Sequence, residues 1–307
     1  MVDLNDNKVA IIGAGKVGLS GAYAMMLDGL VNELVLFGRN KEKIIGDQLD
    51  LSHAMTFAHE TKVVASDDYN DLIGCDIVFF TAGAAQEPGQ SRLDLAKTNL
   101  AILEDTIPKV VAVAPEAVIV IITNPVDVLT YRAAQIANLP YGQVFGTGTT
   151  LDTGRFRFNL AQSLNINSRS IHTYILGEHG DSSFPMISSA TVGGQKLTEL
   201  PDFSYEKAEQ SYLDARDAAA TIINAKGATF YGIGAVMKKV VATVLRDAKT
   251  VLPLTVPLND YYGVSDVSLS VPCVLGKKGV QRVFFVDLDE SEQEKLRQSA
   301  ETVKQFL

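Results

Sequence analysis

"KVAIIGAGKVG", residues 8–18, joins a short apolar run to a glycine-rich turn and to the start of an apolar helical pattern. Gly13, Gly15 and Gly18 have the spacing G-x-G-x-x-G. Between a strand and a helix, Gly13 permits a tight turn, Gly15 lets a pyrophosphate approach the backbone, and Gly18 allows close helix packing. The stretch therefore predicts a dinucleotide-binding turn, with the phosphates at the helix N-terminus. A glycine-rich turn that binds no ligand is the alternative interpretation.

Apolar runs of the same kind recur as far as residue 146, and helical patterns separate most of them. They predict strands at 8–12, 33–37, 62–65, 76–81, 117–122 and about 143–146. Strands that alternate with helices are typical of a parallel sheet, and uninterrupted apolar runs indicate strands covered on both faces. We therefore expect an α/β fold with a doubly wound parallel (Rossmann) sheet, in a dinucleotide-binding domain at residues 1–146.

The remainder, residues 147–307, is less regular and is expected to form an α+β substrate domain packed against the first, with the site between them. The pattern predicts a helix from about 150, a strand pair around 170–176 and 186–193, one long helix over about 205–246, strands near 267–275 and 281–287, and an amphipathic helix at 289–307.

Composition excludes several classes of function. The net charge of −9 disfavours nucleic acid, which needs a basic face, and disfavours anionic membranes. The acidic, polar start "MVDLNDNK" has no signal pattern, and Pro115 and Glu116 interrupt the longest apolar stretch. Cys75 and Cys273 form no CxxC motif and belong to no His/Cys cluster. We therefore expect a cytoplasmic protein without a disulfide framework or a metal site.

The stretch "LVLFGRN", residues 34–40, bears on the choice of cofactor. NAD-binding units place an acid about twenty residues after the third glycine, where this chain has Gly38 followed by Arg39. A carboxylate would bind both ribose hydroxyls and repel a 2′-phosphate, whereas a neighbouring arginine could pair with that phosphate. The sequence therefore predicts a site for NAD that also accepts NADP, unless Arg39 points to solvent.

Three residues are candidates for the chemistry of hydride transfer to a carbonyl. His179 lies between two glycines in "GEHGDSSFP", residues 177–185, and could supply the proton. Asp152 and Arg155 share a helix face, where the acid could hold the imidazole and the arginine could grip a carboxylate. A structural histidine and a salt bridge at the helix start are the alternatives.

Two further loops follow predicted strands. "TAGAAQEPGQSRLDLAKTN", residues 81–99, carries Arg92, and "ITNPVD", residues 122–127, carries Asn124. Loops at the carboxyl ends of parallel strands bind ligands and can act as lids. Both loops are therefore candidates for the substrate site.

The order of six motifs gives a resemblance that covers essentially the whole chain: GAGKVG, TAGAAQEPGQSR, TNPVD, GTTLDTGRFR, GEHGD and KGATFYG. The chain resembles the lactate/malate dehydrogenase family, and within it the bacterial enzymes that fructose 1,6-bisphosphate regulates. The resemblance implies reversible hydride transfer between a nicotinamide cofactor and pyruvate or L-lactate. A dehydrogenase for larger 2-keto acids and a catalytically idle nucleotide-binding protein are the alternatives.

The resemblance also implies a role for each catalytic residue. His179 would donate and accept the proton, and Asp152 would orient it and pair with its charge. Arg155 would bind the substrate carboxylate, and Arg92 would polarise the carbonyl as its loop closes.

The rest of the substrate site is assigned in the same way. Asn124 would contact substrate and cofactor, and Thr229 of KGATFYG would line the side-chain pocket. Gln86 stands where the malate enzymes of the family carry arginine, and Glu87 follows it. A second substrate carboxylate would have no cationic partner there, so pyruvate is expected and oxaloacetate should be rejected.

The predicted cofactor site comprises the glycine turn, the end of the second strand and the two loops: Gly13, Gly15, Val17, Gly18, Gly38, Arg39, Lys43, Tyr69, Gly83, Ala84, Thr123 and Asn124. Arg157 and His172 match residues with which the regulated enzymes bind fructose 1,6-bisphosphate across a subunit interface. They imply an allosteric homotetramer, and the alternative is a surface arginine with an exposed histidine.

Overall fold

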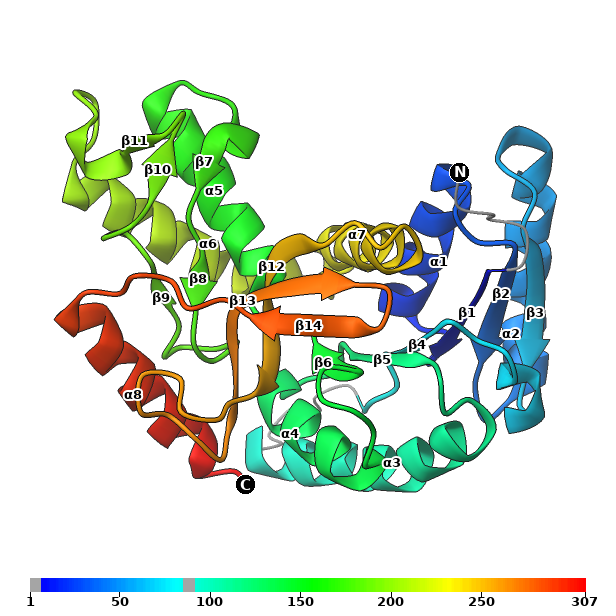
Figure 1. Cartoon of the computed structure of the whole chain (residues 1–307). Coiled ribbons are helices and arrows are strands. Elements are labelled where there is room, and N and C mark those ends of the chain that lie inside the picture. Colours follow the sequence, from blue (N-terminus) through cyan, green and yellow to red (C-terminus); the bar gives the residue numbers. More distant parts are fainter. Residues whose placement is uncertain (1–6, 85–91) are drawn as a thin grey trace.

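The computed structural model describes residues 7–84 and 92–307, and for residues 92–95 the backbone alone. A nine-stranded sheet with the order β14-β13-β12-β6-β5-β4-β1-β2-β3 runs through the molecule (Figure 1). Six of its strands are mutually parallel, which confirms the predicted doubly wound α/β fold. They are β1 (Lys8–Ile12), β2 (Glu33–Phe37), β3 (Lys62–Ser66), β4 (Ile77–Phe80), β5 (Val118–Ile121) and β6 (Val144–Gly146).

Successive residues of these strands enter two separate hydrophobic clusters, because side chains alternate between the faces of a sheet. Along β1, for example, Val9 and Ile11 belong to one cluster and Ala10 and Ile12 to the other. Helices α1 (Lys16–Asp28), α2 (Lys41–Ala54) and α7 (Tyr231–Leu245) contribute to the first cluster, and α3 (Arg92–Val113) and α4 (Val126–Ala137) to the second. Both faces are covered, as the uninterrupted apolar runs predict.

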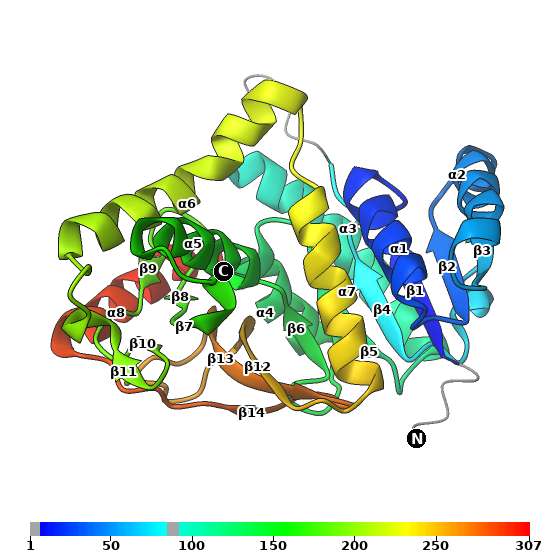
Figure 2. The same cartoon turned by 90° about the horizontal axis from the view of Figure 1, so that it is seen from above.

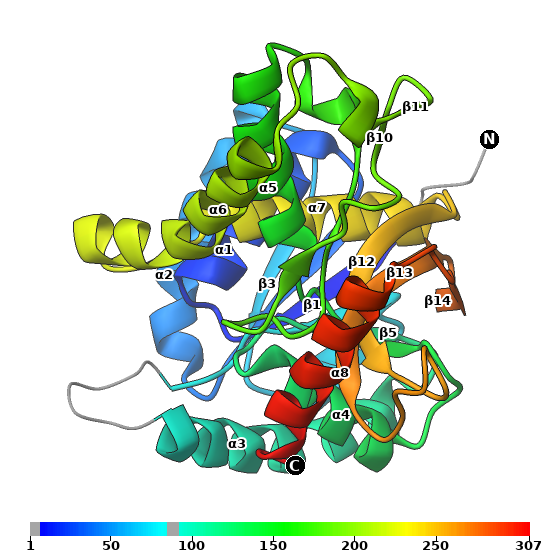
Figure 3. The ribbon, with the colours of Figure 1, turned by 90° about the vertical axis from the view of Figure 1, so that its left-hand side faces the viewer.

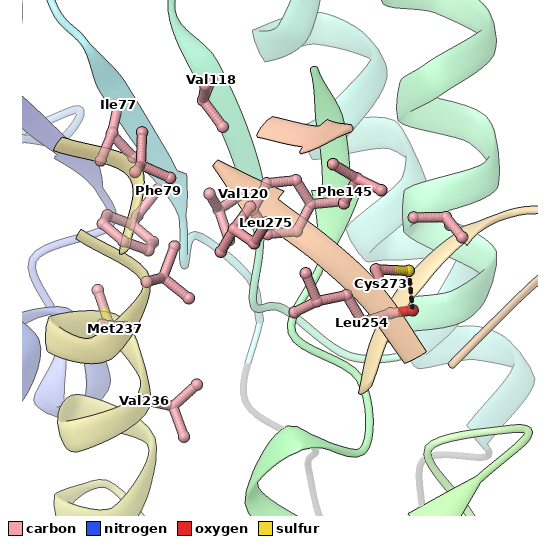
Figure 4. Packing of buried hydrophobic residues seen from close by; sticks show 14 of the residues in the cluster. Ile77, Phe79, Val118, Val120, Phe145, Val236, Met237, Leu254, Cys273 and Leu275 are labelled. Atoms are coloured by element: carbon pink, nitrogen blue, oxygen red, sulfur yellow. Dashed lines mark hydrogen bonds between the residues drawn. The ribbon is translucent and has the colours of Figure 1, made fainter. Parts of the chain in front are cut away.

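Helix α7 comes from the second half of the chain but packs on α1 of the first (Figure 2). Glycines allow the two helices to approach closely. A Cβ on Gly21 would lie 2.6 Å from Met237, and one on Gly234 would lie 2.9 Å from the backbone of Ser20. Met237 and Phe79 of β4 lie in the same buried cluster (Figure 4). The two halves therefore share the first of the two hydrophobic clusters.

Three antiparallel strands extend the parallel sheet: β12 (Thr250–Pro257), β13 (Ser268–Gly276) and β14 (Gly279–Val283). Thr255 of β12 pairs with Gly146 of β6, so β12 joins the two halves. The sequence pattern did not predict β12, because Pro253 and Pro257 disguise a run that is otherwise rich in β-branched residues.

Two other expectations about the second half are wrong. The single helix expected over 205–246 is two helices, α6 (Tyr205–Lys226) and α7, because Gly227 ends α6 in the left-handed region at φ +83°. The expected strand pair is four short strands: β7 (Ile171–His172) pairs with β10 (Thr191–Val192), and β8 (Ile175–Leu176) pairs with β9 (Phe184–Pro185).

The expected helices near 150 and at the end of the chain are confirmed as α5 (Thr150–Leu164) and α8 (Glu290–Lys304). Helix α5 packs on α6, and α8 packs against β13 (Figure 3). The short strand β11 (Gln195–Lys196) pairs with β10. Within the described part of the chain, no helix combines the length and apolar character needed to cross a bilayer. The same part contains no group of three or more metal-ligating side chains.

Candidate active site

The glycine turn after β1 leaves room in front of α1. Gly13 has φ +109°, and a Cβ there would lie 2.6 Å from the amide nitrogen of Ala82. A Cβ on Gly18 would lie 2.5 Å from the carbonyl oxygen of Gly13. Gly15, the N-cap of α1, is exposed, and apart from its two chain neighbours no described residue has an atom within 4 Å of its Cβ position. Open space at the positive end of a helix fits a pyrophosphate.

Gly38 and Arg39 follow the last residue of β2. The Gly38 N–H donates to the carbonyl of Ser66 on β3 at 3.0 Å, so the backbone here is held by the sheet. A Cβ on Gly38 would approach only the flexible end of Ile44, at 2.9 Å. Arg39 is exposed, so its guanidinium is accessible to a ligand as well as to solvent.

Three other predicted cofactor residues lie near the ends of strands β1 and β2. Val17 is half-buried in the first turn of α1. Asn40 caps α2 by accepting the backbone N–H of Lys43 at 3.2 Å, and the Lys43 side chain is exposed. The Tyr69 ring packs on Phe37, the last residue of β2, with 4.6 Å between centroids. Phe37 and Tyr69 therefore form an apolar edge beside Gly38.

The loops after β4 and β5 are tied to one another. Thr123 donates its hydroxyl to the carbonyl of Ala82 at 2.8 Å, and a Cβ on Gly83 would lie 2.6 Å from the Thr123 methyl. Asn99 of α3, only 2% exposed, accepts the Ala84 N–H and donates to the Asn124 carbonyl, both at 2.8 Å.

The sequence interpretation did not single out Asn99. The available signal was its helical spacing, which places Asn99 on the same face of α3 as the buried Ala96 and Leu103. Gln86 lies outside the described residues. Arg92 begins α3, and its side chain is outside the description.

His179 meets Asp152 across 27 residues of sequence. It lies in the turn between β8 and β9, and its Nδ1 is 2.6 Å from Oδ2 of Asp152 in the first turn of α5. Arg155, one turn further, donates to Oδ1 of Asp152 at 3.1 Å and to the Thr229 hydroxyl at 3.4 Å. The structure thus brings together four predicted residues from three segments. Because Nδ1 faces Asp152, Nε2 is the ring nitrogen available for proton exchange with a ligand.

Asp152 lies between two cations, His179 and Arg155, which both stabilise its carboxylate, while Arg155 opposes the charge of His179. Burial lowers the pKa of His179, but the charge and hydrogen bond of Asp152 outweigh it, Asp127 adds to them, and the pKa rises to about 9. Burial raises the pKa of Asp152, but His179 and Arg155 outweigh it and hold that pKa below its usual value. At neutral pH the site therefore holds an imidazolium beside a carboxylate.

A second acid, Asp127, touches His179 from α4. It is 3% exposed, and its Oδ2 accepts the backbone N–H of His179 at 2.7 Å. Its Oδ1 accepts the hydroxyl of Thr255 on β12, also at 2.7 Å. The sequence interpretation took Asn124 from TNPVD and missed Asp127, since nothing local indicates which way that side chain points.

The two predicted effector residues lie on a different part of α5 and β7. Arg157 donates through Nε and Nη2 to the carbonyl of Thr173, at 2.8 and 2.5 Å, and its guanidinium lies 5.0 Å from the Tyr174 ring centroid. Burial lowers the pKa of Arg157. His172, the neighbour of Thr173 in sequence, is exposed. Arg157 thus points away from Arg155 and Asp152, toward the strand that carries His172.

Comparison of the sequence with family models and with known proteins identifies relatives of this chain. Residues 7–146 match the family model described as lactate/malate dehydrogenase, NAD binding domain, and residues 149–307 match the lactate/malate dehydrogenase, alpha/beta C-terminal domain. The chain is 42% identical over 299 residues to the L-lactate dehydrogenase of Thermoanaerobacterium saccharolyticum, covering 96% of each chain. It is 39% identical to that of Lacticaseibacillus casei, over 100% of this chain and 95% of the relative.

Solved structures with the same fold are also lactate dehydrogenases. The minor L-lactate dehydrogenase from Enterococcus mundtii superposes with a TM-score of 0.94 at 39% identity, over 98% of this chain and 97% of that one. A lactate dehydrogenase from a Medee basin deep-sea metagenome library, MGS-M5, has the same TM-score at 37% identity, over 98% of both chains.

Proposed function

The chain belongs to the lactate/malate dehydrogenase family, and we propose that it is an L-lactate dehydrogenase that interconverts pyruvate and L-lactate. The observation that carries this proposal is the contact of His179 with Asp152, next to the Arg155–Asp152 ion pair. This contact brings together a proton donor, its counter-charge and a residue that can bind a carboxylate. The group lies where our two proposed domains, residues 1–146 and 147–307, meet, since Asp127 of the first contacts His179 of the second.

The cofactor residues fit a nicotinamide dinucleotide. The open space at Gly15 suits a pyrophosphate, and the tied loops at Thr123 and Asn124 lie at the carboxyl edge of the same sheet. When bound, the cofactor supplies the hydride for pyruvate reduction and accepts it in lactate oxidation.

The protein's own residues bind the substrate and move the proton. Arg155 uses two of its five N–H donors on Asp152 and Thr229, which leaves donors for a bidentate bond to the substrate carboxylate. His179 gives the proton at Nε2 to the carbonyl oxygen during reduction and takes it back during oxidation. Asp152 stabilises the imidazolium in both directions, and Arg92 polarises the carbonyl.

Substrate choice follows from charge. Thr229 bonds to Arg155, so it lines the pocket beside the bound carboxylate. Gln86 and Glu87 offer no cation for a second carboxylate. A small monocarboxylate such as pyruvate therefore fits better than oxaloacetate, whose second charge would be unpaired.

Cofactor choice follows from Gly38 and Arg39. We propose that NAD is the cofactor and that NADP is used as well. Position 38 is a glycine, so it has no carboxylate that would repel a 2′-phosphate. The exposed Arg39 can pair with that phosphate.

Regulation is a further part of the proposal. Arg157 and His172 lie on adjoining segments, and the exposed His172 is accessible to a phosphate. We propose that fructose 1,6-bisphosphate binds here and activates a homotetramer. Cys75 and Cys273 are both free and buried, which fits the reducing cytoplasm as the location.

The test is the change in nicotinamide absorbance with pyruvate, oxaloacetate and a branched 2-keto acid as substrates. His179→Asn should lower turnover by about 10²–10⁴-fold, the usual contribution of a positioned acid, and should still bind cofactor. His53→Asn, an exposed histidine of α2, is the matched control and should keep wild-type turnover. A His179→Asn enzyme within a few-fold of wild type, or a wild type that turns over none of the three acids, contradicts the proposal.

A further inference from the structure

Asp127 is a buried carboxylate beside the catalytic pair. It is 3% exposed, and burial raises its pKa to about 6, against the opposing effect of hydrogen bonds from Thr255 and His179 and of the charge of His179. A buried acid costs free energy unless hydrogen bonds satisfy it. Both oxygens of Asp127 are used, one by His179 and one by Thr255. The contact with His179 involves the backbone N–H, so it acts on the turn that carries the ring.

A buried polar network extends from Asp127 to the segment that carries Asp152. The Thr255 hydroxyl lies 3.0 Å from that of Ser270 on β13, and the Ser270 hydroxyl accepts the N–H of Thr149 at 3.0 Å. Thr149 is the N-cap of α5, three positions before Asp152. The Ser270 backbone also exchanges two hydrogen bonds with Gly177, at 2.9 and 3.0 Å. One network therefore holds both the His179 turn and the start of α5.

We propose that Asp127 is a positioning residue for the proposed reaction, one that holds the backbone of His179 so that its ring meets Asp152 and that favours the protonated ring by its charge. The inference rests on the proposed function for its kinetics, but not for its geometry. The other charged groups acting on His179 are Asp152 and Arg155, both on α5. Glu178, next in sequence, acts on Asp127. Asp127 is the negative charge that approaches from α4.

Two substitutions separate the two roles of Asp127. In Asp127→Asn, the amide oxygen can still accept the His179 N–H and the amide nitrogen can donate to Thr255, so the clamp stays and the charge goes. Asp127→Ala removes both. Thr255→Val and Thr255→Ser are a second pair, in which valine breaks the network and serine keeps its hydroxyl. Thr61→Val is the control for Thr255, because both threonines are fully buried. Thr61 donates to the Val31 carbonyl at 2.9 Å and directly precedes β3, the edge strand opposite β14.

Two measurements are needed. NMR titration of labelled histidine in the full-length protein without ligands gives the pKa of His179. The signal of His179 is the one that is missing from the spectrum of His179→Asn. Steady-state kinetics gives kcat and KM for pyruvate. Asp127→Asn should lower the pKa of His179 by about one unit, the smaller end of the effect of a neighbouring charge, and should keep kcat at low pH within a few-fold of wild type.

Asp127→Ala should lower the pKa equally and also reduce kcat by about ten-fold or more, since a shift of ~1 Å in a catalytic group can cost ~10²-fold. KM should change little, because Arg155 keeps its contacts. Thr255→Val should reduce kcat, and Thr255→Ser should restore it. If Asp127→Ala does not fold, the Thr255 pair and Asp127→Asn decide.

An unchanged pKa of His179 in Asp127→Asn would overturn the inference. So would Asp127→Ala and Thr255→Val variants whose kcat stays at the level of the Thr61→Val control. Failure of the proposed function is distinguishable from this. Wild type would then not act on pyruvate, while the NMR titration would still report whether Asp127 acts on His179.

Discussion

Replacing Asp152 with asparagine removes the charge that outweighs burial at His179. The wild-type pKa of about 9 lies roughly 2.5 units above the ordinary histidine value of ~6.5. In Asp152→Asn, burial is opposed mainly by Asp127, so the pKa of His179 should fall to about 6.5 or below. At pH 7.5 the protonated fraction of the ring would then drop from nearly complete to about one tenth.

The assay is kcat/KM for pyruvate reduction from pH 5.5 to 10. In wild type it should stay level at low pH and fall as the pH rises through about 9, because the reaction needs the imidazolium. Lactate oxidation should show the opposite slope, because it needs the neutral ring. In Asp152→Asn both transitions should move to about pH 6.5, whereas Asp105→Asn, at an exposed ion pair of α3, should leave them in place. Coincident profiles for Asp152→Asn and wild type would refute the reasoning.

The same shift predicts how stability depends on pH. The pKa of His179 is higher in the folded than in the unfolded state, so its stabilisation is complete below about pH 6.5 and is lost as the pH rises through about 9. A difference of roughly 2.5 units corresponds to about 3 kcal/mol. Urea unfolding of wild type should therefore show a loss of about that size between these pH values, relative to His179→Asn. Equal slopes in the two proteins would contradict the raised pKa.

The remaining predictions concern the cofactor and the effector. Gly38→Asp should raise the ratio of kcat/KM with NADH to kcat/KM with NADPH by about ten-fold or more, because the carboxylate forms a charged hydrogen bond to the ribose and repels the 2′-phosphate. Arg39→Ala should lower kcat/KM with NADPH and leave kcat/KM with NADH nearly unchanged. No measurable turnover of wild type with NADPH would show that Arg39 points to solvent and does not bind the 2′-phosphate. Fructose 1,6-bisphosphate should lower the KM for pyruvate or stabilise the tetramer in sedimentation, and Arg157→Gln should abolish the response. An equal response in Arg157→Gln would rule out this site.

Features that depend on short stretches of chain were predictable from the sequence. The turn at Gly13 needs a positive φ, and the strands around it need only an apolar run, so the doubly wound sheet followed from local patterns. Asp152 and Arg155 had to share a helix face because helical spacing places them there. The glycine-flanked turn singled out His179 as a proton donor, and the motif resemblance assigned Asp152 as its partner. The structure brings the two to 2.6 Å from one another.

Features that depend on segments distant in sequence required the tertiary structure. Two local features were missed as well, because two prolines disguise strand β12 and the helical pattern on both sides of Gly227 hides the break there. Asp127 lies 52 residues before His179, and only packing decides that its carboxylate reaches that backbone. The pKa of His179 has the same origin. It depends on burial and on charges a few ångströms away, and those distances arise when α4, α5 and the β8–β9 turn meet in the folded chain.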